Sequence, residues 1–445
     1  MGRRATSVLP VGLALAAGFW AACATNSDDE LRQGGDTTVD DRSSLAFLHS
    51  SPALTMADAE QFQNGTSPFD FHWEPPQLGP LYNNDSCFGC HSQNGRGMAQ
   101  IGSAGAEIDI NGPQSQSLVR TSLLMGSADP TFPTGPIPVP GYGTQLHDHA
   151  TTGLPQVVIN LSWVEHDVTY GDGTTLTLRA PSLDIKAADN SALPDGMLFS
   201  YRIAPPLIGV GLLFAVDPSK DVPPTGPNAA GVHGVMNMVW DPTQMATVPG
   251  RLGWKANTAT IELQAALAGQ NDMGLSTSIF PDSDGTHDIA DDQFTAMVFF
   301  LNTIAVPQAA DRDATATQGR ELFDSFGCSD CHTVTQHTGS AAIEGIANQE
   351  IHPYTDLLIH DMGSGLADGR PDYEASGSQW RTPALWGIGL AQTVTANVTF
   401  MHDGRARTFE EAIMWHGGEA QAAHDNFAAA SASDRAALVA FLGTL

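Results

Sequence analysis

The sequence predicts a mainly α-helical chain with an irregular insertion that contains β-strands, built from two similar units in tandem. Two observations predict this arrangement. A Cys-x-x-Cys-His motif occurs twice, at residues 87–91 and 328–332, and an amphipathic helix pattern follows each copy, at residues 288–304 and 431–445. Between the motifs, about residues 112–270 are rich in Gly, Pro and Thr and carry short runs typical of strands, such as "QVVINLSWVEHDVTY".

The two motifs are the clearest chemical signal in the chain. They consist of Cys87, Cys90 and His91 in the first copy and of Cys328, Cys331 and His332 in the second. A histidine follows one such pair by chance in about 3% of cases, and both pairs in about 0.1%. Two thiols at this spacing can each form a thioether with a haem vinyl group while the adjacent histidine binds the iron. The sequence therefore predicts two covalently bound haem c groups, with His91 and His332 as proximal ligands.

Two other sites use paired cysteines and fit the sequence less well. A four-cysteine zinc site places its pairs about 15–20 residues apart, whereas about 240 residues separate these pairs. A thioredoxin-like redox motif needs a strand and helix around it and no following histidine.

The N-terminus has the pattern of an export signal. Arg3 and Arg4 precede a mostly apolar run at residues 8–22, which is too short to span a bilayer comfortably. Residues 1–22 resemble a lipoprotein signal peptide, after which Cys23 would carry the lipid; ordinary cleavage nearby is the alternative. With four cysteines assigned to haem and one to lipid, none is left for a disulfide bond.

The segment after the signal peptide predicts a tether and a location. Residues 23–44 are acidic and polar, which indicates a flexible, lipid-anchored linker. Ala24 follows the cysteine where an Asp would indicate retention in the inner membrane. We therefore expect a protein that faces the periplasm and is anchored by lipid to the outer membrane.

The chain is strongly acidic, and this restricts its partners. The net charge is −30, and loss of residues 1–22 removes two arginines and no acid, which gives −32. Such a surface repels nucleic acid and anionic lipid and would attract a basic redox partner. An acidic surface that only aids solubility is the simpler interpretation.

The motif positions predict the domain boundaries. We expect a first haem c domain at residues 45–306, interrupted by the insertion at about 112–270, and a C-terminal cytochrome c domain at residues 307–445. The second domain also shows a helix before its motif, where Leu322, Phe323 and Phe326 form one apolar face. Its last helix is expected to begin with Ser433 as N-cap.

A family resemblance extends from about residue 62 to residue 445. It is carried by "LGPLYNNDSCFGCHSQNGRG", "YGTQL", "YRIAPPLIGVGLL", "GRLGWKA", "NDMGLSTSIFP", "PYTDLLIHDMGSGLADGR", "WRTPALWGIGL" and "FMHDGRARTFEEAIMWHGGEA". The chain resembles the di-haem oxidoreductase family, often labelled thiol oxidoreductases, which is related to bacterial di-haem cytochrome c peroxidases. The thiol label has no counterpart here, because no cysteine is left to react.

The resemblance implies a distal ligand for the second haem. His416 falls where the peroxidase relatives place the distal Met or Tyr, in the last turn of a short helix that Thr408 and Glu411 begin as a capping box. We expect His416 to bind the iron; Met414 and Met401 are alternatives, and a histidine favoured by the helix dipole is the structural alternative.

The distal ligand of the first haem is ambiguous in the sequence. The candidates are Met98, His147, His149, His233 and Met273. Met273 lies in the family-like "NDMG" and is favoured, whereas Met98 follows His91 too closely to reach the opposite face. A five-coordinate first haem is the alternative.

Further roles follow from the resemblance. Arg381 and Tyr354 are expected to hold haem propionates, and Trp254 to lie between the haems as an electron relay, although core packing is the simpler role for a tryptophan. The acid–base group that peroxide cleavage needs has three candidates, namely Gln145, Glu107 and Glu262. The acidic loop at residues 281–292 is a weak calcium candidate that fails the EF-hand pattern.

The resemblance implies a di-haem oxidoreductase of the cytochrome c peroxidase type. It would reduce peroxide or a similar oxidant with electrons from a small periplasmic donor, either a cytochrome or a copper protein. A di-haem electron carrier without its own substrate and an oxidase of a protein partner are the alternatives. An open sixth position at the first haem would favour an enzyme.

Overall fold

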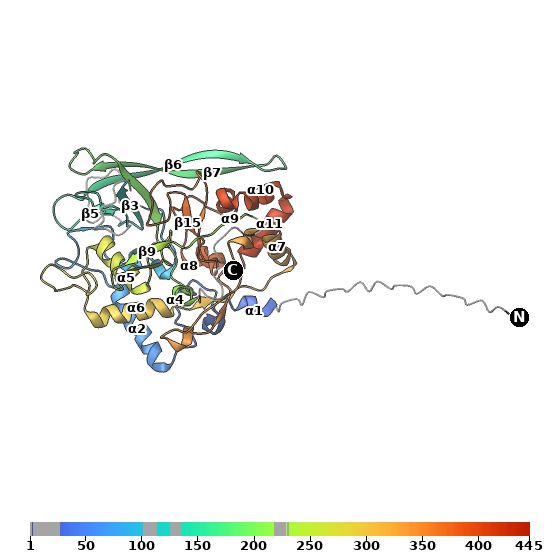
Figure 1. Cartoon of the computed structure of the whole chain (residues 1–445), viewed down its shortest axis with the longest axis horizontal. Helices are drawn as coiled ribbons and strands as arrows, with labels where there is room; N and C mark the ends of the chain where they lie inside the picture. Colours follow the sequence, from blue (N-terminus) through green and yellow to red (C-terminus); the bar gives the residue numbers. More distant parts are fainter. Residues whose placement is uncertain (1, 3–26, 101–113, 125–134, 218–227, 229–230) are drawn as a thin grey trace.

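The computed structural model describes residue 2 and residues 27–100, 114–124, 135–217, 228 and 231–445 (Figure 1). The described helices are α1 (Ser27–Leu31), α2 (Met56–Asp70), α3 (Cys87–Cys90), α4 (Val210–Ala215), α5 (Ile261–Ala268), α6 (Asp291–Thr303), α7 (Ala314–Ser325), α8 (Ala391–Val394), α9 (Phe409–Met414), α10 (Gln421–Ala429) and α11 (Ala432–Leu442). The described strands are β1 (Thr38–Val39), β2 (Leu81–Tyr82), β3 (Ser117–Leu123), β4 (Gln145–Leu146), β5 (His149–Ala150), β6 (Val157–Thr169), β7 (Thr175–Ala187), β8 (Met197–Ile203), β9 (Met238–Asp241), β10 (Ala246–Pro249), β11 (Val306–Pro307), β12 (Gln336–His337), β13 (Glu350–Ile351), β14 (Ile359–Asp361) and β15 (Gln379–Arg381).

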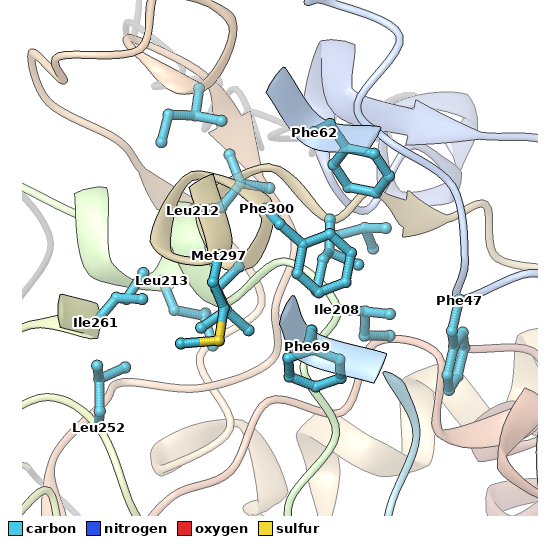
Figure 2. Close-up of a cluster of buried hydrophobic side chains, with 14 of the residues drawn as sticks. Phe47, Phe62, Phe69, Ile208, Leu212, Leu213, Leu252, Ile261, Met297 and Phe300 are labelled. Carbon is cyan, nitrogen blue, oxygen red and sulfur yellow. The ribbon is translucent and has the colours of Figure 1, made fainter. Parts of the chain in front are cut away.

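Helices α2 and α6 cross in the N-terminal half and form the centre of the largest apolar core. Phe62 and Phe69 of α2 pack on Phe300 of α6, with ring centroids 4.9 Å and 5.2 Å apart (Figure 2). The crossing is close at Gly65, where an added Cβ would lie 2.1 Å from the Ala296 carbonyl oxygen. Glycine is therefore needed for the two backbones to approach.

Helices α7 and α11 repeat this crossing in the C-terminal half. Phe323 of α7 packs on Phe441 of α11 with ring centroids 5.4 Å apart. An added Cβ at Gly319 would lie 1.9 Å from the Ala437 carbonyl oxygen. In each half a glycine and a phenylalanine four residues later cross an alanine and a phenylalanine four residues later. The helix pair places the Cys-x-x-Cys-His motif of its half against the core.

The central segment forms small antiparallel sheets. Strands β4, β3 and β8 lie in that order, with Val119 opposite Leu146 on one side and opposite Tyr201 on the other. These three side chains and the start of β6 form a separate buried cluster. The strands lie inside the insertion at about residues 112–270 for which the sequence predicts irregular structure with β-strands.

Strands β6 and β7 form a long hairpin that joins the two halves of the molecule. Thirteen residues of each strand pair, and the hairpin runs along the top of the molecule above α9 and α10 (Figure 1). At its far end Tyr170 packs on Phe427 of α10, and Asp172 forms a 2.8 Å ion pair with Arg435 of α11. Arg179 donates a 3.1 Å hydrogen bond to the Arg405 carbonyl.

The secondary structure is more mixed than the sequence predicts. Across the described residues, 30% lie in helices and 21% in strands, so the expectation of a mainly α chain is wrong in its proportions. Helical periodicity is a clear signal in a sequence, whereas a strand of two residues is too short to show an alternating pattern. No described helix has the length and apolar character needed to cross a membrane.

The expected flexible linker at residues 23–44 is in large part folded. Its described residues include α1 and β1, and Thr38 pairs in parallel with Val306 of β11. Glu30 of α1 lies 2.7 Å from Arg312 and 3.2 Å from Arg320. The composition of the segment indicates a solvated linker, because the partners that fold it lie far away in the sequence and leave no local pattern. Residues 1–22 and Cys23 lie outside the described part apart from residue 2.

Candidate functional site

The first motif lies beside a cavity of about 230 Å³, here named the first cavity. Cys87 and Cys90 begin and end α3 and line this cavity with His91. The His91 Nδ1 atom lies 2.9 Å from the Pro205 carbonyl oxygen. A carbonyl only accepts, so Nδ1 carries the hydrogen and the Nε2 lone pair is free to bind a metal.

The second motif lies beside a cavity of about 460 Å³, the second cavity, which Cys328, Cys331 and His332 line. The His332 Nδ1 atom donates to the Tyr354 carbonyl over 2.9 Å. Burial lowers the pKa of His91 and of His332 to about 4, so both imidazoles are neutral. A neutral imidazole with Nδ1 protonated is the form that binds haem iron.

His416 faces His332 across the second cavity. Helix α9 begins where the Thr408 side chain accepts from the Glu411 amide, and His416 follows its last turn. The His416 Nδ1 atom lies 2.8 Å from the Ala412 carbonyl, which leaves Nε2 free, and the two imidazole centroids are 6.5 Å apart. Two imidazoles on opposite sides of one iron lie about 6 Å apart, for metal–nitrogen bonds of about 2 Å. The pair fits an iron between them.

The two methionine alternatives differ in their position relative to the second cavity. Met401 lines the second cavity, whereas Met414 packs in the apolar core of the C-terminal half and does not contribute to the cavity wall. The structure therefore favours His416 over Met414 on position alone.

One candidate distal residue of the first haem lies in the first cavity. Met273 ends the turn that follows α5, is 3% exposed and lines the cavity wall. His147 contacts the Asn271 carbonyl, and His149 contacts Asp148; neither lines the cavity, nor does Met98 or His233. Among the described wall residues, His91 is the sole histidine.

A single layer of side chains separates the two cavities. The residues that line both are Arg96, Pro206, Ile208, Trp254, Arg381, Pro383, Ala384 and Trp386. The Trp254 indole donates a 2.8 Å hydrogen bond to the Ile203 carbonyl, which fixes the ring in this wall. The structure thus places Trp254 between the sites, where the resemblance implies it.

Two arginines in this wall donate their hydrogen bonds to backbone carbonyls, and in the described part of the chain neither has a carboxylate within salt-bridge distance. Arg96 donates to the carbonyls of Thr399 and Met401, and Arg381 to those of Gly253 and Thr382. Burial lowers the pKa of each guanidinium to about 10, and each is still charged at neutral pH. Buried cations that lack a carboxylate at salt-bridge distance suit an anionic ligand such as a haem propionate.

Tyr354 does not have the expected role of binding a propionate through its hydroxyl. The hydroxyl lies 3.2 Å from Arg312 and 3.3 Å from Glu30, and the residue does not line the second cavity. Its carbonyl is instead the acceptor of the His332 hydrogen bond.

Two of the three acid–base candidates, Glu262 and Gln145, lie outside the first cavity. Glu262 is exposed on α5, and Gln145 is buried behind the wall, where its amide donates a 2.8 Å bond to Asp272. Glu107 lies outside the described residues. Asp272 itself lines the cavity, and burial raises its pKa, although Arg120 and Gln145 counteract this. Gln264, two residues after Glu262 on α5, also lines the first cavity.

Sequence reasoning missed three polar residues at the second cavity. His360 lies 3.6 Å from the Cys331 sulfur, between Asp356 at 2.9 Å and Glu419 at 3.0 Å. His402 stacks on Trp380 with ring centroids 3.6 Å apart. His360 and His402 stand in "LLIHDMG" and "FMHDGRA", within segments that carry the family resemblance, so that signal was present. Arg96 follows the first motif in "QNGRG".

The calcium expectation for residues 281–292 finds no support. Asp282 and Asp288 both bind the Ser276 hydroxyl, at 2.9 Å and 2.8 Å, and Asp284 binds Thr286. In the described ranges no group of three or more His, Cys, Asp or Glu side chains is arranged to hold a metal ion. The loop carboxylates have protein donors instead.

Two motif-bearing cavities, separated by one layer of side chains, define a redox protein with two haem centres. The chain belongs to the family described as "Di-haem oxidoreductase, putative peroxidase", whose model matches residues 28–290 and 282–445. Among solved structures it is similar to hydrazine synthase of Kuenenia stuttgartiensis pressurised with xenon, with 13% identity, a TM-score of 0.37 and coverage of 100% of each chain. No curated protein matches the chain.

Proposed function

We propose that this di-haem oxidoreductase reduces hydrogen peroxide or a similar oxidant, with haem c bound covalently at both motifs. For peroxide the balance is H₂O₂ with two electrons and two protons giving two water molecules. The observation that carries the proposal is the asymmetry of the two cavities. The second has His416 opposite His332, whereas His91 has no second histidine among the described residues of the first cavity wall.

The asymmetry divides the work between the two sites. Haem iron supplies an electron store and, where its sixth position is exchangeable, the place at which an oxidant is reduced. His332 and His416 would hold the second haem with two strong ligands, which suits electron transfer. At the first site Met273 would offer only a weak thioether, so the iron held by His91 would stay open to a small oxidant. Arg96 and Arg381 would hold propionates in the shared wall.

The donor and location follow from charge and from the N-terminal sequence. The net charge of −30 favours a small basic periplasmic donor, a cytochrome or a copper protein. Electrons from the second site would reach the first through the wall that contains Trp254. Lipid at Cys23 would anchor the protein to the outer membrane, facing the periplasm.

The decisive test is electron paramagnetic resonance of the purified holo-protein, oxidised and half-reduced, before and after peroxide is added. We expect one low-spin centre that ignores peroxide and one high-spin ferric signal that responds to it. Two low-spin centres that are indifferent to peroxide in both states would reject the enzyme and leave an electron carrier. Mass spectrometry of the denatured chain tests covalent attachment at both motifs.

Asp272 is the residue placed to exchange a proton with an oxidant in the first cavity. We expect Asp272→Asn, which preserves shape, to slow peroxide turnover about 10²- to 10⁴-fold, because it removes a general acid–base group. The haem spectra should not change. Glu262→Gln, on the solvent side of α5, is the control and should turn over at the wild-type rate. Equal rates for both variants would exclude Asp272 from catalysis.

A further inference from the structure

The two proximal histidines use the same hydrogen bond but depend on very different acceptors. His91 donates to Pro205, which is followed by Pro206 in the chain, so the acceptor peptide is held by two rigid rings. His332 donates to Tyr354, whose φ of +56° lies in the left-handed region. That region disfavours a bulky side chain, so the backbone at Tyr354 needs support from its surroundings.

The support comes from the Tyr354 side chain. The residue is 0% exposed, and its ring lies 5.8 Å from the Phe323 ring and 6.0 Å from the Phe441 ring, between the crossed helices α7 and α11. Its hydroxyl is the remaining polar group. It contacts Arg312 at 3.2 Å and Glu30 at 3.3 Å.

Glu30 links this tyrosine to the N-terminal segment of the chain. Its carboxylate binds Arg312 at 2.7 Å and Arg320 at 3.2 Å, and its side chain is 17% exposed. Burial raises the pKa of Glu30, but the two arginines outweigh it and leave the pKa below its ordinary value. The carboxylate is therefore charged at neutral pH and fastens α1 to the C-terminal half.

We propose that Tyr354 and Glu30 are positioning residues for His332, so that the N-terminal segment 27–39 tunes the reduction potential of the second site. A firm Nδ1 hydrogen bond makes the imidazole a stronger electron donor and stabilises oxidised iron. Loss of the tyrosine hydroxyl or of Glu30 releases the peptide that accepts this bond. The proposal rests on haem being bound at the second motif but does not depend on peroxide as substrate.

The test is a potentiometric titration of the holo-protein, followed optically and by electron paramagnetic resonance. Tyr354→Phe and Glu30→Ala should each shift the potential of the second haem upward and broaden its low-spin signal, while the first haem is unchanged. Glu30→Gln should give a smaller shift than Glu30→Ala, since its amide can still bond to the tyrosine hydroxyl. Asp36→Asn is the control, because Asp36 lies on the same segment in an exposed 3.5 Å pair with Arg32.

The outcomes separate this inference from the proposed function. The inference is overturned if both haems are present and the potentials of Tyr354→Phe and Glu30→Ala equal those of the wild type and of Asp36→Asn. If Tyr354→Phe does not fold, Glu30→Ala decides, since its side chain lies outside the aromatic core. Absence of haem from the second motif of the wild-type protein overturns the haem assignment, and with it this inference.

Discussion

At the scale of single residues, the position of His416 carries the proposal for the second site. Its imidazole stands opposite His332 with Nδ1 tied to the Ala412 carbonyl, so the free nitrogen faces the cavity. A second strong ligand closes an iron to exogenous molecules and favours electron transfer.

Removal of this ligand gives a direct prediction. His416→Ala should convert the second centre from low-spin to high-spin, raise its reduction potential and allow cyanide or imidazole to bind there. Optical and resonance spectra of the oxidised protein measure this. His424→Ala, one helix further along the same cavity wall, is the matched control and should keep the wild-type spectrum. A low-spin second centre in His416→Ala would assign its ligand to another residue.

Local chemistry explains which site residues the sequence could predict. The spacing of Cys87, Cys90 and His91 is itself the chemical requirement, so a short motif suffices. The sequence could not show that Glu262 and Gln145 lie outside the first cavity, because the direction in which a helix or strand residue points depends on packing against distant parts of the chain. Asp272 directly precedes the favoured Met273 in the same motif, but no feature of the neighbouring sequence indicates that its side chain lines the cavity.

At the scale of helices, the close crossings depend on single glycines. We expect Gly319→Ala to destabilise the protein by about 1–3 kcal/mol, since its Cβ would meet the Ala437 backbone, which cannot move as a side chain can. Urea denaturation of the holo-protein measures the loss. Gly269→Ala is the control, because its φ is −52° and its nearest neighbour would lie 3.9 Å away, which is ordinary contact. Equal stability of the two variants would mean that the crossing can relax.

The sequence predicted long helices well and their ends less well. The pattern at residues 288–304 corresponds to α6, Asp291–Thr303. The last helix was expected to start from Ser433, but its N-cap is Ser431. The Ser431 hydroxyl accepts a hydrogen bond from the backbone amide of Asp434, three residues later. The folded segment that contains Glu30 was missed, since its arginine partners lie 282 and 290 residues away.

At the scale of the whole molecule, a buried cluster of charges joins the two halves. Arg202 of β8 binds Asp372 at 2.6 Å, and Lys255 binds Asp368 at 3.0 Å. Arg370 also binds Asp372, at 2.6 Å. Burial opposes ionisation of Asp372, but the neighbouring cations hold its pKa well below its ordinary value. The carboxylate is thus the anionic centre of this contact.

Neutralising that centre should weaken the whole fold. We expect Asp372→Asn to cost about 3–5 kcal/mol at pH 7, because it removes the carboxylate that lies 2.6 Å from both Arg202 and Arg370 and leaves Arg202 only its longer 3.8 Å pair with Asp368. A carboxylate whose pKa is lower in the folded than in the unfolded protein stabilises the fold fully above its ordinary pKa of about 4. This stabilisation is lost as the pH falls toward the pKa in the folded protein. The gap between wild type and variant should therefore narrow below about pH 4, as urea denaturation at several pH values would show.

The control for this prediction is a charged pair at the surface. Asp184→Asn breaks an exposed 2.7 Å pair with Lys186 and should change stability by less than about 1 kcal/mol. A similarly small loss for Asp372→Asn would show that the halves are held by apolar packing and by the β6–β7 hairpin, with little contribution from the charge cluster.

The repeated crossing of α2 with α6 and of α7 with α11 has a consequence for the history of the chain. The same glycine, alanine and two phenylalanines recur at the same spacing in both halves. Duplication of one ancestral unit would leave this arrangement. Each copy could then diverge while the other preserved the shared framework. The half with His416 would have specialised in electron transfer, and the half that gained the long insertion would have been free to acquire a substrate.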